Sequence, residues 1–306
     1  MSISYEGKVA IVTGAGGGLG RSHALALAAR GAKVVVNDLG GDVHGEGGSS
    51  SAAEAVVKEI EDAGGEAIAH GANVCDEGQV ADMVKKTMDK WGRIDILINN
   101  AGVLRDKTFT KMDLADFKFV MDVHVMGTVT CTKAVWDIMR EQAYGRIVMT
   151  TSSSGLYGNF GQSNYGAAKM AVVGFMNTLC LEGAKYNINV NCLAPMAATR
   201  MTEGLLPQAA LDLSTPESVT AGLLTLCDDD APNRTILAAG AGGYAKAVVY
   251  ETEGIYLTPD EQTPENVRAG FDDLSNAEGQ QELVQGGQQS MKFIGKAAAA
   301  LGVKVG

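Results

Sequence analysis

The chain of 306 residues carries a formal net charge of −11, with a pI near 4.9, and 46% of its residues are hydrophobic against 20% charged. This balance is that of a globular protein large enough to bury a substantial core. It argues against nucleic-acid binding, because affinity for a phosphate backbone depends on clustered lysine and arginine side chains, and the sequence has no basic tract.

Targeting and metal-binding signals are also missing from the sequence. No stretch approaches the roughly eighteen consecutive apolar residues of a membrane span, and residues 1–6 lack the basic and apolar regions of a signal peptide. We therefore expect a cytoplasmic protein with no membrane contact. The five cysteines are never spaced as Cys-x-x-Cys, and the four histidines are scattered. This pattern favours reduced thiols and predicts no metal site.

The first predicted element is a strand at residues 8–13, an apolar and β-branched run that leads directly into a glycine-rich turn and then a helix. The turn contains Gly14, Gly18, Leu19 and Gly20. Its glycines would let the backbone approach a diphosphate, while the following helix offers free N–H groups and the positive end of its dipole. Glycine-rich turns also occur for purely conformational reasons. Whether this turn binds a dinucleotide therefore depends on the residue that ends the next strand.

A second predicted strand, at residues 33–38, ends in Asp38, eighteen residues after Gly20. An acidic side chain at this spacing would accept hydrogen bonds from the adenosine ribose hydroxyls of a dinucleotide. Its charge would repel a 2′-phosphate, and no lysine or arginine lies at residues 14–20 to offset it. We therefore expect NAD rather than NADP as the cofactor. The alternative for Asp38 is an ordinary turn residue at the end of a strand.

The remaining elements alternate between strand and helix. Residues 39–51 form a polar, glycine-rich connection, which we interpret as a surface loop rather than a second phosphate-binding turn. We then expect helices at about 52–63, 79–91, 114–139 and 163–186, and strands at about 66–72, 94–99, 145–151, 188–193 and 235–239. Apolar strands of this kind are typically buried on both faces. The pattern predicts a doubly wound, Rossmann-type α/β fold, with a parallel seven-stranded sheet and helices on both faces.

One domain, at residues 1–242, accounts for this alternation. Residues 243–306 form a C-terminal extension, which we expect to pack on the same domain. Within it, residues 245–251 have the pattern of an added strand, residues 263–268 that of a helix start with proline in the first turn, and residues 279–289 that of a surface segment. The extension would serve as a dimer contact, as a substrate lid or as neither.

Tyr165 and Lys169 have the clearest chemical meaning, because they stand four positions apart in a predicted helix, with Ser152 at the end of a predicted strand. Side chains at i and i+4 share one helix face, with about 5–6 Å between their Cβ atoms, so the ammonium of Lys169 can lie beside the phenol of Tyr165. A nearby cation favours the phenolate and lowers the pKa of the tyrosine toward neutrality. The same spacing arises by chance on amphipathic helices, so its meaning depends on the other motifs.

Four motifs occur in a characteristic order: Thr13-Gly14-x-x-x-Gly18-x-Gly20, Asn99-Asn100-Ala101-Gly102, Ser152 and Tyr165-x-x-x-Lys169. Together they resemble the short-chain dehydrogenase/reductase family over about residues 6–240. The resemblance implies that Tyr165 is the acid/base, that Lys169 lowers its pKa and binds the nicotinamide ribose, and that Ser152 orients the substrate oxygen.

The resemblance also assigns the residues that would line the NAD groove. Besides the glycine turn and Asp38, they are Asn73 and Val74 at the adenine, Asn99, Ala101 and Gly102 along the groove, and Pro195 and Thr199 near the nicotinamide, together with Tyr165 and Lys169.

Two positions depart from the usual family pattern. His124 stands where the family usually has an asparagine that helps to hold a water in a proton relay. A histidine here either takes the relay role or packs in the core. Ala194-Pro195-Met196 stands where the family commonly has proline followed by glycine, which concerns the backbone beside the nicotinamide.

Both departures, with Tyr157-Gly-Asn-Phe-Gly-Gln162, resemble one branch of the family, the dehydrogenase unit of the type 2 peroxisomal multifunctional enzymes. That unit oxidises (3R)-hydroxyacyl-CoA to 3-ketoacyl-CoA with NAD, in the degradation of fatty acids or sterol side chains. The resemblance implies the same activity for this chain, and a homodimer. Because it ends in Lys304-Val-Gly306 and is too short for further catalytic domains, we expect a freestanding bacterial counterpart.

An acyl-CoA substrate brings several phosphate charges to a protein that is itself acidic, so it requires a local basic patch. Arg105, Lys107 and Lys111 are candidates for this patch, and a solvated loop face is the alternative. A hydroxysteroid dehydrogenase is a second hypothesis, because the same catalytic residues serve many secondary alcohols. A non-catalytic dinucleotide-sensing protein is a third, and the presence of both Tyr165 and Lys169 argues against it.

Overall fold

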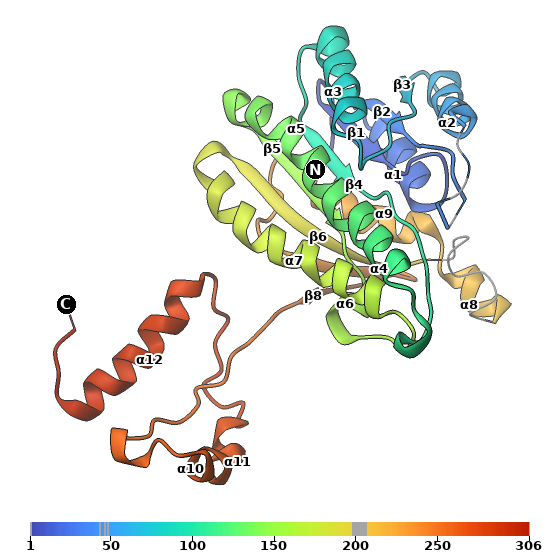
Figure 1. The fold of residues 1–306 in the computed structure, drawn as a ribbon. Helices are drawn as coiled ribbons and strands as arrows, with labels where there is room; N and C mark the ends of the chain where they lie inside the picture. Colours follow the sequence, from blue (N-terminus) through green and yellow to red (C-terminus); the bar gives the residue numbers. More distant parts are fainter. Residues whose placement is uncertain (1, 43, 46, 48, 198–206, 306) are drawn as a thin grey trace. The chain divides into compact units, whose positions relative to one another are not determined.

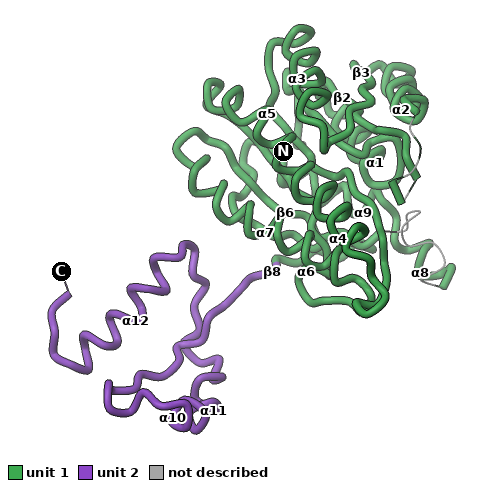
Figure 2. Tube along the Cα trace, viewed as in Figure 1, with its two compact units in different colours: residues 1–246 green, residues 247–306 purple. Residues whose placement is uncertain are grey.

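The computed structural model describes residues 2–42, 44, 45, 47, 49–197 and 207–305. It divides the chain into two compact units, residues 1–246 and residues 247–306 (Figure 2). The first unit contains a single sheet with helices on both of its faces, and the second contains several short helices and one longer helix (Figure 1).

The sheet has eight strands in the order β3-β2-β1-β4-β5-β6-β7-β8. Their bounds are β1 (Val9–Thr13), β2 (Lys33–Asn37), β3 (Glu66–His70), β4 (Ile96–Asn99), β5 (Gly145–Thr150), β6 (Ile188–Met196), β7 (Ile236–Gly240) and β8 (Gly243–Ala247). Strands β1 to β7 pair in parallel. The doubly wound parallel fold is therefore confirmed, while the sheet contains eight strands where the sequence predicts seven.

The additional strand β8 follows a two-residue turn. Ala241 and Gly242 join it to β7 with positive φ angles of 48° and 77°. Positive φ at both central residues is the geometry of a type I′ hairpin turn, and so short a connection permits only antiparallel pairing. The sequence pattern indicates an added strand slightly further along the chain, because residues 247–250 are the most apolar part of this segment.

Helices of the first unit cover the sheet from both sides (Figure 1). Those packed with α1 are α2 and α9, and those on the opposite face include α3, α5 and α7. The bounds are α1 (Gly18–Ala28), α2 (Ser51–Asp62), α3 (Glu77–Trp91), α4 (Leu114–Met121), α5 (Gly127–Gln142), α6 (Ser153–Tyr157), α7 (Ser163–Gly183), α8 (Gln208–Leu213) and α9 (Pro216–Thr225), with 3-10 turns η1 (Phe109–Lys111) and η3 (Ala184–Tyr186).

The predicted long helix at residues 114–139 is divided in the structure. Between α4 and α5 lies a π-helical turn, η2 (Asp122–Met126), with His124 at its centre. A π-helical turn is rare, and it shifts the side chains that follow it around the helix axis, often at functional sites. The apolar periodicity of the sequence does not reveal it, because one wide turn barely changes the pattern of buried positions.

The core lies between the central strands and the helices, and β1 is buried at all five of its positions. The strand order reverses between β1 and β4, which are neighbours in the sheet. In an open parallel sheet, this reversal leaves a crevice beyond the carboxyl ends of the strands. The glycine turn, Asp38 and Ser152 follow β1, β2 and β5 closely, so all of them lie at this edge.

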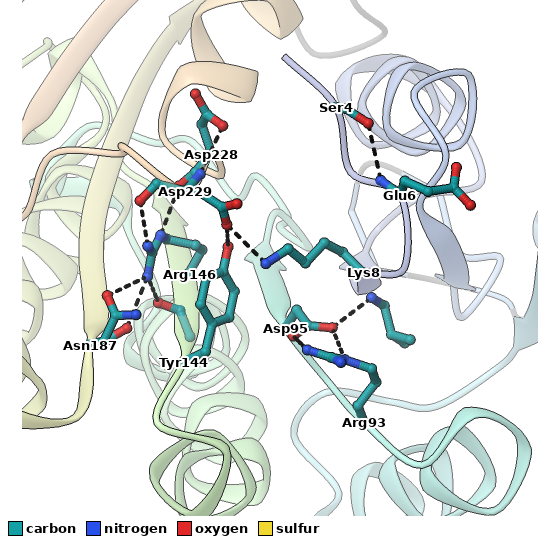
Figure 3. A network of polar contacts seen from close by, with 12 residues as sticks. Ser4, Glu6, Lys8, Arg93, Asp95, Tyr144, Arg146, Asn187, Asp228 and Asp229 are labelled. Carbon is teal, nitrogen blue, oxygen red and sulfur yellow. Dashed lines mark hydrogen bonds and ion pairs between the residues drawn. The ribbon is translucent and has the colours of Figure 1, made fainter.

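The opposite, amino edge of the sheet is held by a polar network around Arg146 (Figure 3). The buried guanidinium donates hydrogen bonds to the backbone oxygens of Asp228 and Asp229, each at 2.8 Å, and to that of Asn187 at 2.9 Å. Tyr144 packs its ring against the guanidinium and donates to the carboxylate of Asp229 at 2.8 Å. This network joins β5 to the loops before β6 and β7, away from the edge that carries the predicted site.

The second unit, residues 247–306, contains η4 (Pro259–Glu261), α10 (Pro264–Ala269), α11 (Phe271–Leu274) and α12 (Gly286–Leu301). Thr263 caps α10 and Pro264 is its first residue, in agreement with the predicted helix start. Lys292 and Lys296 of α12 form ion pairs with Glu251 at 3.0 Å and Glu253 at 2.7 Å. The expected packing of this segment on the first unit stays a prediction.

Among the described residues, no helix combines the length and the hydropathy that crossing a membrane requires.

Candidate active site

The structure brings Ser152 and Tyr165 together through close packing of two helices. Ser152 caps α6 and accepts a hydrogen bond from the backbone N–H of Ser154 at 3.1 Å, while Tyr165 lies in the first turn of α7. A Cβ on Gly155 would lie 2.8 Å from Lys169 Cβ and backbone carbon, so only glycine lets α6 approach α7 this closely. The serine hydroxyl consequently lies close enough to the Tyr165 phenol to act on its pKa.

Lys169 is buried, and its ammonium is fixed by the end of β5. Nζ donates to the backbone oxygen of Thr150 at 2.6 Å, and the neighbouring Thr151 hydroxyl donates to the backbone oxygen of Lys169 at 2.6 Å. Nζ lies 5.5 Å from the centroid of the Tyr165 ring, so the two side chains share one helix face as predicted. Burial lowers the pKa of Lys169 to about 7, which leaves charged and neutral forms both populated near neutrality.

The pKa of Tyr165 differs from the sequence expectation. Burial raises it to about 12, and the neighbouring Ser152 hydroxyl acts in the opposite direction. The nearby Lys169 does not reverse this effect, because the same dry surroundings that disfavour a phenolate also disfavour the ammonium. In the free protein the phenol is therefore protonated at neutral pH.

His124 is buried against Tyr165. Its ring meets that of Tyr165 edge to face, with centroids 5.2 Å apart and an interplanar angle of 87°. Burial and the charge of Lys169 lower its pKa well below the ordinary value, so the imidazole is neutral. Its Nε2 lies 2.8 Å from the backbone oxygen of Val103 and 3.1 Å from its nitrogen. The shorter distance indicates that Nε2 carries the hydrogen and donates it to that oxygen.

The other ring nitrogen, His124 Nδ1, is buried and has no hydrogen-bond partner among the described residues. Buried polar atoms are nearly always paired, so an unpaired one indicates a position for a water or a ligand. A Cβ on Gly102 would lie 2.4 Å from His124 Cε1, so the glycine of Asn-Asn-Ala-Gly is needed to make room for this ring.

The glycine turn has the shape of a diphosphate cradle. Gly14 and Gly18 have positive φ angles of 63° and 51°, and a Cβ on Gly20 would lie 2.2 Å from the backbone oxygen of Gly14. Helix α1 begins here, with no side chain capping its first turn. Leu19, inside the turn, packs against the hydrophobic core. The open N–H groups and the positive helix end suit an anion such as a diphosphate.

Asp38 lies directly beside this turn. Its Oδ2 accepts a hydrogen bond from the backbone N–H of Gly16 and its Oδ1 one from that of Gly40, both at 2.7 Å. A side chain at Gly16 would come within 2.9 Å of the carboxylate. Backbone groups of Gly16 and Gly40 thus hold Asp38 at the edge of the cradle. The glycine turn and this carboxylate together fit a dinucleotide.

Sequence reasoning missed two residues that join this cradle to β4. Asn100 Nδ2 donates to the backbone oxygens of Thr13 at 3.1 Å and Gly14 at 3.0 Å. The hydroxyl of Thr13 in turn accepts from the backbone N–H groups of Asn100 and Ala101. Both asparagines belong to the motif Asn99-Asn100-Ala101-Gly102, but only the fold shows that Asn100, and not Asn99, contacts the glycine turn.

Asn99, predicted to line the groove, is buried, and its Nδ2 donates to Thr132 Oγ1 on α5 at 3.1 Å. Asn73, also predicted to contact the cofactor, accepts the Cys75 N–H through Oδ1, while the buried Val74 packs against Gly127.

Asn37, the last residue of β2, positions the segment that carries Asn73 and Val74. Its side chain pairs with both backbone groups of Ala72, at 2.9 Å to the nitrogen and 3.3 Å to the oxygen. No sequence pattern predicts this contact, because it joins residues thirty-five positions apart.

On β6, Pro195 pairs in register with Ala239 of β7. Thr199, predicted to contact the nicotinamide, lies outside the described residues. Strand β6 continues through Pro195 to Met196. Met196, which stands where the family commonly has a glycine, is therefore the last residue of the strand.

The basic residues predicted to bind coenzyme A include two that are engaged with carboxylates. Lys107 Nζ lies 2.9 Å from Asp116 and 3.3 Å from Asp113, and the guanidinium of Arg105 lies 3.7 Å from Asp116. Phosphates would have to compete with these carboxylates for the two side chains.

A sequence profile described as short chain dehydrogenase matches residues 8–210, about two thirds of the chain and all of the site residues that the structure describes. The chain belongs to the short-chain dehydrogenase family. It is therefore an oxidoreductase, and the resemblance drawn from its motifs is confirmed.

Within the short-chain dehydrogenases, the chain is similar to larger peroxisomal proteins. It is 46% identical to the peroxisomal multifunctional enzyme type 2 of mouse over 281 residues, which are 90% of this chain and 38% of that protein. The structure of the full-length enzyme of the same name from Drosophila melanogaster superposes with a TM-score of 0.82 at 36% identity, covering 97% of this chain and 50% of that one. The chain thus spans half or less of these relatives.

A second solved structure is a 7α-hydroxysteroid dehydrogenase in complex with NADH and 7-oxo glycochenodeoxycholic acid. It matches with a TM-score of 0.70 at 28% identity and covers 78% of this chain and 95% of that one. A short-chain dehydrogenase named for a hydroxysteroid substrate therefore shares this fold.

Proposed function

We propose that the chain oxidises the 3-hydroxyl of a (3R)-hydroxyacyl-CoA to the ketone, with NAD as the hydride acceptor. The observation that carries the proposal is the cluster of buried Lys169 with partly buried Ser152 and Tyr165, beside a cradle that suits a dinucleotide. NAD, when bound, accepts the hydride from the alcohol carbon. All other steps fall to side chains of the protein.

Ser152 and Tyr165 would hold the substrate hydroxyl between them. Ser152 lies close enough to the phenol to lower its pKa, so a substrate hydroxyl between the two side chains could take hydrogen bonds from each. As hydride leaves, Tyr165 takes the proton, and Ser152 donates to the developing alkoxide. Lys169, fixed by Thr150, stabilises the phenolate during this step and would hold the nicotinamide ribose.

The choice of NAD over NADP rests on Asp38. Its carboxylate is held by Gly16 and Gly40 at the rim of the cradle, where ribose hydroxyls could share its oxygens. A 2′-phosphate at the same place would face a negative charge at hydrogen-bond distance. NADH in the similar hydroxysteroid dehydrogenase agrees with this choice.

The acyl-CoA substrate class rests on the similarity to type 2 peroxisomal multifunctional enzymes, which exceeds that to the hydroxysteroid dehydrogenase. A steroid alcohol is the second candidate, because the fold and the site chemistry are shared with that structure. A cytoplasmic homodimer is part of the same proposal by family analogy.

We assign His124 to the relay that returns the proton from Tyr165 to solvent. Its ring packs at nearly a right angle to that of Tyr165, and its unpaired Nδ1 is a buried acceptor able to hold a water next to the catalytic pair. A neutral imidazole suits this role because it can accept and pass on a proton without carrying a lasting charge.

Alcohol oxidation should accelerate with pH. Because the phenolate of Tyr165 is the active base and its pKa in the free protein is raised to about 12, the active fraction grows as the pH rises below that value. We expect kcat/KM for oxidation of a (3R)-hydroxyacyl-CoA with NAD to rise from about pH 7 to about pH 10, roughly tenfold per pH unit at the steepest. Steady-state assays across this range, with wild-type protein and Tyr165→Phe, measure it.

The control substrates for this assay are the (3S) isomer and a 7α-hydroxysteroid. Tyr165→Phe should bind NADH as the wild type does and lose turnover by at least about a thousandfold. Residual activity near the wild-type level would remove Tyr165 as the base. Efficient oxidation of the steroid alone would replace the acyl-CoA assignment by the second candidate.

Replacing Asp38 with alanine should weaken NAD binding and relax the discrimination against NADP. We expect the ratio of kcat/KM for NAD over that for NADP to fall by about a hundredfold, because both the ribose contact and the repulsion of a 2′-phosphate are lost. Glu54→Ala, which removes an exposed carboxylate from the first turn of α2, is the matched control. An unchanged ratio in Asp38→Ala would show that the ribose is bound elsewhere.

Replacing His124 with alanine should lower kcat by about a hundredfold and leave KM nearly unchanged, because the relay acts on proton transfer and not on binding. His124→Asn, which restores the residue usual in the family, should recover most of that loss. The solvent deuterium isotope effect on kcat, compared between the two variants, separates a relay from packing. Equal activity of both variants and the wild type would assign His124 a packing role only.

A further inference from the structure

The connection from β2 to α2 closes on itself beside Asp38. The backbone N–H of Ser49 donates to the oxygen of Leu39 at 2.9 Å, so these two residues bring the ends of the connection together and form its neck. Gly40, with φ +77°, donates its N–H to Asp38, and a Cβ there would lie 1.9 Å from the oxygen of Ser49. Only glycine permits this neck, which therefore lies against the carboxylate proposed to hold the ribose.

The far side of the loop contacts the segment that follows β4. His44 Nδ1 donates to the backbone oxygen of Leu104 at 3.1 Å, and Arg105 Nε donates to the backbone oxygen of His44 at 3.0 Å. A Cβ on Gly45 would lie 2.7 Å from Phe119 Cζ and 3.2 Å from a methyl of Val103. We call these contacts of His44 and Gly45 the clasp.

The clasp joins the loops that follow the two neighbours of β1. In the sheet, β1 separates β2 from β4, so a contact from the loop after β2 to the loop after β4 passes the carboxyl end of β1, over about 10 Å. The glycine turn proposed to hold the diphosphate follows β1 directly. The clasp would therefore lie across the groove between the ribose end proposed at Asp38 and the nicotinamide end proposed near Tyr165.

The clasp is joined to the catalytic helix as well. The backbone oxygen of Arg105 accepts a hydrogen bond from Asn164 Nδ2 at 2.9 Å. The side chain of Asn164 is buried, and its Oδ1 accepts from the backbone N–H of Tyr165 at 2.8 Å. The residue that holds His44 thus also fixes the start of α7, so the clasp has a rigid anchor on its substrate side.

We propose that the clasp retains the bound dinucleotide, so that His44 and Gly45 set the rate at which cofactor is released and take no part in hydride transfer. This inference rests on the proposed function. Among the described residues the clasp consists of two partly exposed hydrogen bonds and the close approach of Gly45 to Phe119. Breaking a few exposed contacts of this kind costs little free energy. Opening of such a closure commonly limits product release, and with it the turnover of an enzyme.

Two glycines of the loop provide a matched test. Gly45 and Gly47 have nearly equal φ angles, +81° and +83°, so alanine introduces a similar backbone strain at either position. A Cβ on Gly45 would meet Phe119, whereas a Cβ on Gly47 meets nothing within 4 Å. Any difference between Gly45→Ala and Gly47→Ala therefore reports the contact with Phe119. His44→Ala removes the hydrogen bond to Leu104 from an exposed position and serves as a second variant.

The measurement is stopped-flow release of NADH, followed by its fluorescence, from the full chain. We expect Gly45→Ala and His44→Ala to release NADH about tenfold faster than the wild type, and Gly47→Ala to stay within about twofold of it. The single-turnover rate of hydride transfer and its primary deuterium isotope effect should be the same in all four proteins.

Equal release rates from Gly45→Ala, Gly47→Ala and His44→Ala would overturn the clasp. Slower hydride transfer with unchanged release would also overturn it, because it would place these residues in the chemical step. Should Gly45→Ala fail to fold, as judged by circular dichroism, His44→Ala decides the question. Failure of the wild type to bind NADH at all would instead contradict the proposed function, and the two failures are thereby distinguished.

Discussion

The site depends on the hydrogen bond by which the buried ammonium of Lys169 is held on the backbone oxygen of Thr150 at 2.6 Å. This contact ties helix α7 to the end of β5, and Ser152 follows that strand after only one intervening residue. Strand and helix therefore deliver the serine, the tyrosine and the lysine to one place as a rigid unit. Burial has a cost, since it raises the pKa of the phenol and lowers that of the amine. The pair is consequently sensitive to a change in its surroundings, such as the arrival of a charged ligand.

Close backbone approach is the second constraint, and it recurs at each part of the site. Gly20 lies against Gly14 in the cradle, Gly102 against His124, and Gly155 against Lys169. At all three positions a Cβ would come closer than 3 Å to its neighbour, so a larger residue would force two functional elements apart. The glycines thus set distances that the polar side chains need, and they do so in addition to supplying unusual backbone angles.

The sequence predicts the parallel α/β fold well, because short and uniformly apolar, β-branched runs such as residues 8–13 favour strands that are buried on both faces. It also predicts that Tyr165 and Lys169 share a helix face. It does not predict the π-helical turn at His124, since periodicity is insensitive to one wide turn. Nor does it predict the role of Asn100 or the pKa of Tyr165. Both depend on which groups the fold brings together from distant parts of the chain, and on how much water they exclude.

Titration of Tyr165 itself tests the proposed mechanism most directly, with tyrosine labelled by carbon-13 at the ζ position and the resonance assigned by its loss in Tyr165→Phe. We predict a pKa near 12 in the free protein, which falls by roughly two pH units when NAD is bound, because the positive nicotinamide then stabilises the phenolate. A resonance that titrates at the same pH with and without saturating NAD would contradict the mechanism, since the tyrosine would then not sense the cofactor it is proposed to serve.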